Sequence, residues 1–61
     1  MDDKFVIRKN KYLADGINFI TKINYIYYTN DKNELIFEFP KENKVIEAYR
    51  IMLELRRKFN N

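Results

Sequence analysis

Two runs of alternating apolar and polar residues, separated by a short polar segment, constrain the fold of this chain more than any other feature. Between the runs, Asn30-Asp31-Lys32-Asn33 is dense in turn-forming residues. Alternation with a period of two on both sides of a turn is typical of an antiparallel β-hairpin. The sequence therefore predicts paired strands over Ile23–Thr29 and Glu34–Phe39. The core face of the second strand is expected to consist of Leu35, Phe37 and Phe39.

The segments on either side of the hairpin predict one more strand and two helices. Phe5-Val6-Ile7 is a short β-type run. Asn10 can cap a helix over residues 11–20, which carries an apolar stripe of Leu13, Ile17 and Ile20. Pro40 ends the second hairpin strand and suits the first position of a helix that runs to about Phe59. The expected fold is α+β in the order β-α-β-β-α, a three-stranded, mostly antiparallel sheet with two helices packed on one face. It forms a single domain over residues 1–61.

The second predicted helix has an unusually wide apolar side, covering an arc of about 220° at 100° per residue. A narrow sheet would cover one part of that arc, namely Val45, Ala48, Met52, Leu55 and Phe59. One edge of the arc would then lack a partner inside the chain, namely Ile46, Tyr49 and Leu53. We expect a two-fold homodimer that buries this edge. The alternative is a helix wedged between the sheet and the first helix, which would cover much of the arc.

The absence of cysteine and histidine from the 61 residues limits how the chain can be stabilised. A chain of this length buries only about 60% of the surface that its unfolded form exposes. Without cysteine it has no disulfide and no thiolate metal site, and without histidine it lacks the commonest metal ligand. A partner subunit is the remaining stabiliser, and we expect no metal and no cofactor.

The same two absences argue against catalysis, because they remove the usual acid–base and nucleophile groups. The remaining candidates are two carboxylate pairs, Glu34 with Glu38 and Asp2 with Asp3. Glu34 and Glu38 alternate with core residues, which is typical of a solvated strand face. Gly16 is the only glycine, so no glycine-rich phosphate loop is present. We expect a protein that is not an enzyme and has no small-molecule substrate.

The charge pattern suggests a binding role. The net charge is +3 and the pI is about 9.3. The basic residues gather near the two ends of the chain, as Arg8, Lys9 and Lys11 and as Arg56, Arg57 and Lys58. If the ends converge, these six residues could bind nucleic-acid phosphates. The alternative is an ordinary solvated surface, since Glu47 and Glu54 share the polar strip of the second helix.

Three tyrosines of the first hairpin strand allow a second route to nucleic acid. Tyr25, Tyr27 and Tyr28 could offer ring faces on which the bases of a single strand stack. The alternative places Tyr25 and Tyr27 in the core and pairs Tyr28 across the hairpin.

We expect a cytoplasmic protein with no membrane association. No apolar run approaches the roughly 20 residues needed to span a bilayer. The first four residues are acidic where a secretory signal would be basic.

Four short motifs resemble an uncharacterised family of small domains from phages and mobile elements of Firmicutes. They are Phe5-Val6-Ile7, Tyr12-Leu13-Ala14, the run Ile23 to Tyr27, and Ile36-Phe37-Glu38-Phe39. The resemblance covers residues 5 to about 50. The family often has glycine after the first helix, where this chain has Thr21-Lys22.

This resemblance implies a small accessory protein of a phage or mobile element, and it transfers no functional residue. Together with the charge pattern, it predicts a nucleic-acid-binding accessory or regulatory factor. The alternative is a protein-binding factor, such as an inhibitor of a host defence or replication enzyme.

Overall fold

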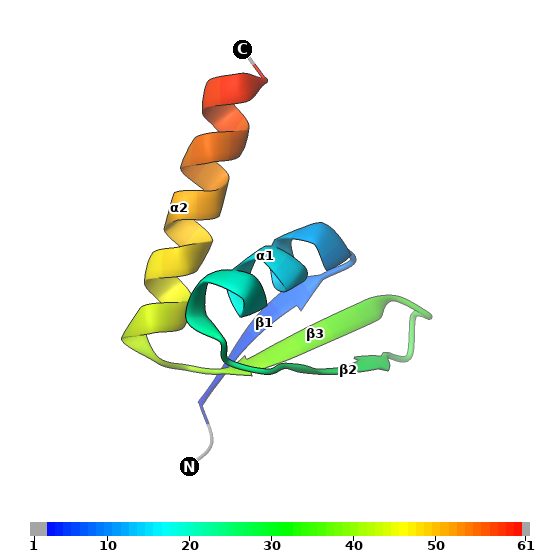
Figure 1. Ribbon diagram of the computed structural model, residues 1–61. Coiled ribbons are helices and arrows are strands. Elements are labelled where there is room, and N and C mark those ends of the chain that lie inside the picture. Colours follow the sequence, from blue (N-terminus) through cyan, green and yellow to red (C-terminus); the bar gives the residue numbers. More distant parts are fainter. Residues whose placement is uncertain (1–2, 61) are drawn as a thin grey trace.

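The computed structural model describes residues 3–60 and confirms the predicted element order (Figure 1). Three strands and two helices follow one another as β-α-β-β-α. Their bounds are β1 (Lys4–Arg8), α1 (Lys11–Thr21), β2 (Ile26–Thr29), β3 (Leu35–Pro40) and α2 (Asn43–Phe59). The described part of the chain measures 34 × 25 × 17 Å along its principal axes.

The sheet has the strand order β1-β3-β2, and both strand pairs are antiparallel. Phe37 of the central strand β3 lies opposite Ile7 on one side and opposite Tyr27 on the other. The predicted hairpin is thus confirmed, although β2 begins at Ile26 rather than at Ile23. The backbone of Ile23 is held by the end of α1, since its N–H donates to Thr21 Oγ1 at 3.1 Å and its carbonyl accepts from Asn18 at 2.9 Å. These bonds keep Ile23 out of the sheet.

The hairpin turn is organised by Asn30. Its side-chain oxygen accepts from the backbone N–H of Lys32 and of Glu34, both at 2.9 Å. Asn33 takes the left-handed conformation with φ of 65°, which asparagine tolerates better than most residues. The turn chemistry that the sequence predicted is therefore what closes the hairpin.

The helix α1 begins where the sequence predicts. The side-chain oxygen of Asn10 accepts from the backbone N–H of Leu13 at 3.0 Å, which satisfies one of the unpaired donors of the first turn. The helix ends at Thr21, and Lys22 follows in the left-handed conformation with φ of 61°. Of the expected stripe, Ile17 is buried and Leu13 is half-buried, but Ile20 is exposed.

Both helices cover the same face of the sheet, as Figure 1 shows and as the makeup of the core requires. The core contains side chains from both helices and from the two strands β1 and β3: Ile7, Ala14, Ile17, Phe37, Phe39, Val45 and Ala48. Tyr25 is half-buried and packs its ring edge-on against Phe37 and Phe39, with ring centroids 5.2 and 5.4 Å apart. The expected core role of the two phenylalanines is confirmed.

Two expectations about β3 are wrong. Leu35 is exposed, because it lies at the turn end of the strand, where it pairs with Thr29. Pro40 is the last residue of β3 and not the first of a helix. The chain stays extended there because Pro40 pairs with Lys4 and the N–H of Lys41 donates to the carbonyl of Asp3 at 3.3 Å.

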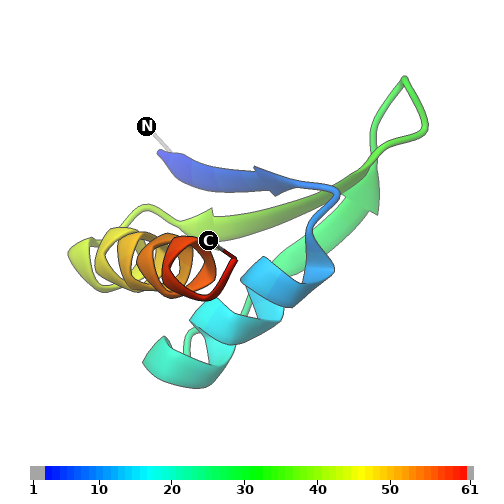
Figure 2. The same ribbon diagram turned by 90° about the horizontal axis from the view of Figure 1, so that it is seen from above.

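The helix α2 leaves the body of the protein after its first turns (Figure 1). In Figure 2 it is seen nearly end-on, because it stands steeply on the rest of the molecule. Val45 and Ala48 are buried, whereas Leu55 and Phe59 are 47% and 79% exposed. The prediction that the sheet covers Leu55 and Phe59 is therefore wrong, since a steep helix soon rises above a sheet.

The two helices are in close contact at Gly16 of α1. A Cβ atom built on Gly16 would collide with the Sδ and Cε atoms of Met52. The single glycine of the chain thus allows the close crossing of α1 and α2.

Candidate binding surfaces

Two hollows lie along α2, one on each side of the contact between Gly16 and Met52. The first is formed with the beginning of α1 and the second with its end. We call them the Arg56 hollow and the Ala48 hollow after one residue in each. Both are open at the surface.

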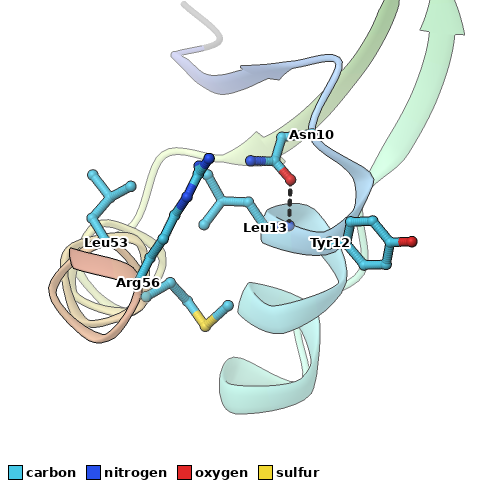
Figure 3. A pocket seen from close by; sticks show the side chains of 6 residues that line it. Asn10, Tyr12, Leu13, Leu53 and Arg56 are labelled. Atoms are coloured by element: carbon cyan, nitrogen blue, oxygen red, sulfur yellow. Dashed lines mark hydrogen bonds between the residues drawn. The ribbon is translucent and has the colours of Figure 1, made fainter. Parts of the chain in front are cut away.

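The Arg56 hollow has a volume of about 370 Å³. It is lined by Asn10, Tyr12, Leu13, Met52, Leu53 and Arg56. Figure 3 shows the Arg56 side chain running from α2 toward Leu13 and Asn10. Arg56 is the only charged residue of the lining. Within residues 3–60 the ion pairs are Lys9–Glu34 and Lys11–Asp15, and neither includes Arg56.

The Ala48 hollow has a volume of about 300 Å³. Its lining comprises Ile20, Thr21, Lys44, Glu47, Ala48 and Ile51. The four residues from α2 are spaced at i, i+3, i+4 and i+7. This is the spacing of the four residues that form a hole for a side chain of a second helix.

The predicted phosphate-binding residues are only partly brought together. Lys9 pairs with Glu34 at 3.2 Å, and Lys11 pairs with Asp15 at 2.7 Å. Arg56 extends toward Asn10, which stands between those two lysines in the chain. The other three predicted residues are exposed elsewhere, Arg8 at the end of β1 and Arg57 and Lys58 in the last turn of α2.

Asp15 links α1 to the segment before β2. Its carboxylate accepts from Lys11 at 2.7 Å and from the hydroxyl of Tyr25 at 2.6 Å. The hydrogen bond from Lys11 and then that from Tyr25 lower the pKa of Asp15. The bond to Asp15 in turn raises the pKa of the Tyr25 hydroxyl. Tyr25 is thus held in a structural contact by its ring and by its hydroxyl.

The three tyrosines do not form one platform. Tyr27 lies across from Phe37 and so shares the helix-covered face, yet it is largely exposed at the edge strand. Tyr28 lies across from Ile36 on the open face and donates its hydroxyl to Glu38 of the next strand. The alternative that Tyr28 pairs across the hairpin is confirmed. The alternative that Tyr27 lines the core is wrong, because Tyr27 lies on the edge strand β2 and is 69% exposed.

The edge of α2 that was predicted to form the dimer is partly covered by other residues of the same chain. The ring of Tyr49 packs edge-on against Phe5 of β1, with centroids 5.0 Å apart, and Ile46 is half-buried. Leu53 remains exposed and lines the Arg56 hollow. The sequence missed the Phe5 contact because it could not show that β1 lies beside α2. The exposed apolar edge of α2 is the opposite one, formed by Ile51, Leu55 and Phe59.

Of the carboxylates considered for catalysis, Glu34 and Glu38 have separate structural partners. Glu34 accepts from the Asn30 amide and pairs with Lys9, and these two contacts, Asn30 first, lower its pKa. Glu38 accepts from Tyr28. Asp2 lies outside the described residues. Residues 3–60 hold no group of three acidic side chains placed to bind a metal ion.

No helix within residues 3–60 has both the length and the apolar character needed to cross a bilayer. No family model, no curated protein and no solved structure matches the chain. The resemblance to a phage and mobile-element family therefore stays a prediction.

Proposed function

We propose that the protein is a non-catalytic binding module that docks a protein partner at the Arg56 hollow. The observation that carries this proposal is an open apolar hollow with a single charge that has no ion-pair partner within residues 3–60. Leu13, Met52 and Leu53 provide the apolar wall. Concave apolar sites with a few placed polar groups are the usual form of a binding site.

The chemistry of the hollow indicates what the partner presents. An apolar or aromatic side chain would fill the space beside Leu13 and Met52. A carboxylate next to that side chain would meet the guanidinium of Arg56, which binds planar carboxylates with two parallel hydrogen bonds. The side-chain oxygen of Asn10 caps α1, which leaves its amide nitrogen as a second donor for the same carboxylate. The partner segment is therefore apolar and acidic, which also suits the positive net charge of this protein.

Nucleic acid is the second candidate, and one observation favours it. The ring of Tyr12 is 89% exposed and lines the same hollow as Arg56, so a base could stack there while a phosphate meets the guanidinium. Two of the six predicted cations weigh against it, because Glu34 and Asp15 already neutralise Lys9 and Lys11. For this reason we rank the acidic protein segment first.

The test is a titration of the protein with a small probe that has both features of the proposed partner. N-acetylphenylalanine carries an aromatic side chain beside a carboxylate, and its amide is a matched neutral control. At about 0.3 kcal/mol per non-hydrogen atom, the acid should bind with a Kd of about 1 mM. Amide-proton NMR shifts should move at Leu13, Met52 and Leu53, and the neutral amide should bind about tenfold more weakly.

Two arginine variants show whether the preference arises at this hollow. Arg56→Met should remove the difference between acid and amide, while Arg57→Met, in the same helical turn but outside the lining, should keep it. Absence of shifts at the hollow with either probe would contradict the proposal. Shifts at Tyr12 and Arg56 with a thymidine oligonucleotide, but with neither probe, would replace it with the nucleic-acid function.

A further inference from the structure

The Ala48 hollow and the exposed end of α2 fit one another. On α2, Ala48, Ile51, Leu55 and Phe59 recur at i, i+3, i+7 and i+11, which places them on one stripe. At one end of this stripe is the hollow above Ala48 and at the other end is Phe59, which is 79% exposed. A cavity of about 150 Å³ accommodates benzene, so a hollow of about 300 Å³ has room for a phenylalanine ring.

Within one molecule, Phe59 cannot enter its own Ala48 hollow. The two residues are eleven positions apart on a continuous helix, or about 16 Å along its axis. Two α2 helices can pair antiparallel with the two-fold axis at the level midway between Ala48 and Phe59. Each Phe59 then lies opposite the Ala48 of the other copy. The same register sets Leu55 opposite Met52. Ala48 is itself only 1% exposed, so Phe59 meets the rim of the hollow, formed by Lys44, Glu47 and Ile51. The contact occurs twice, as an isologous interface requires.

In this register one pair of opposite charges beside the stripe is brought together, whereas Glu54, on the same flank, lies near its own copy. Glu47 and Lys58 lie on the same flank, and Lys58 of one copy comes within two residues of Glu47 of the other, about 3 Å along the axis. Arg50 and Arg57 also lie opposite one another, but on the side of each helix that faces away from the stripe.

We infer that the Ala48 hollow is the docking site for a second copy of this chain. Phe59 of each copy inserts into the hole formed by Lys44, Glu47, Ala48 and Ile51 of the other, and the α2 helices pair antiparallel. This dimer uses the edge of α2 opposite to Ile46, Tyr49 and Leu53. It leaves the Arg56 hollow open, so it goes beyond the proposed function and does not depend on it.

Sedimentation equilibrium over micromolar to millimolar protein concentrations tests the dimer with two aromatic variants. Phe59→Ala should raise the dimer Kd at least about tenfold, because it removes the side chain that fills the hollow. Tyr12→Ala is the matched control, since Tyr12 is similarly exposed but lines the other hollow. It should leave the dimer Kd unchanged while altering the N-acetylphenylalanine titration. A monomer at every concentration, or equal Kd values for Phe59→Ala and the parent chain, would overturn the inference.

Single cysteines then identify the paired edge, because the chain has no cysteine of its own. Among the residues of the stripe, Leu55 is nearest the two-fold axis, so Leu55→Cys should form a disulfide-linked dimer under mild oxidation. Leu53→Cys, on the opposite edge, should stay mostly monomeric on a non-reducing gel. Cross-linking through Leu53→Cys and not through Leu55→Cys would show that the other edge is used, and it would overturn the inference.

Discussion

The two halves of α2 have similar apolar content but very different surroundings. In the first half, Val45 and Ala48 are fully buried against the sheet and α1, and Tyr49 packs on Phe5. In the second half, Leu55 and Phe59 are exposed, although they continue the stripe that begins at Ala48. The difference shows that an apolar stripe on a helix does not by itself identify what covers each part of it. Here the first half of the stripe serves the fold, and the second half is exposed.

The strongest test of this comparison makes the same substitution in the body and at the exposed end. Phe37→Ala should lower the free energy of unfolding by about 3–5 kcal/mol, because Phe37 is fully buried at the centre of the sheet. A domain of this size has little more stability than that, so the variant should be largely unfolded. Phe59→Ala should change the free energy of unfolding by less than about 0.5 kcal/mol in the monomer.

Urea titration followed by circular dichroism measures both values, at a protein concentration low enough to keep the chain monomeric. A stable Phe37→Ala variant would mean that β3 turns its other face to the core. A large loss of stability in monomeric Phe59→Ala would mean that the end of α2 folds back onto the body.

The contact between α1 and α2 lies at the boundary between the two halves of α2, and substitutions of Gly16 can alter it. Gly16→Leu should lower the free energy of unfolding by about 1–3 kcal/mol, because the added side chain needs the space that Met52 occupies. Gly16→Ala should have a smaller effect. The atoms that it displaces are the mobile end of Met52, and alanine improves the helix by about 1 kcal/mol. Thermal melting of the two variants provides the comparison, and equal melting temperatures would place α2 farther from α1.

The smallest expected effect is on the stability of the folded chain at low pH, because Asp15 and Glu34 accept hydrogen bonds as carboxylates. The folded state lowers the pKa of Asp15, so its contribution to stability is complete above the ordinary aspartate value of about 4 and is lost as pH falls through the lower folded value. Asp15→Asn should therefore weaken the decrease of stability below about pH 4. Asp31→Asn, at the exposed hairpin turn, is the control that should leave that decrease unchanged. Identical acid denaturation of Asp15→Asn and the parent chain would contradict the Asp15 contacts.

Local patterns in the sequence were sufficient for the element order, the hairpin and its turn, and the Asn10 cap. Each of these depends on residues within a few positions of one another, such as Asn30 with Lys32 and Glu34, or Asn10 with Leu13. Errors occurred where two elements compete for the same backbone groups or the same face. The sequence placed Ile23 in the hairpin, but the end of α1 takes its hydrogen bonds, and pairing with β1 keeps Pro40 in the sheet.

For the candidate surfaces, too, some features were evident from the sequence and others depended on the tertiary structure. The wide apolar arc of α2 and the basic residues near the chain ends were evident from the sequence alone, because both are properties of side-chain order along one helix or one short run. Which part of the arc remains exposed was decided only by the tertiary structure. It depends on where the sheet ends, on β1 bringing Phe5 to Tyr49, and on Gly16 allowing α1 to approach Met52. Those contacts join residues more than thirty positions apart, and no local period encodes them.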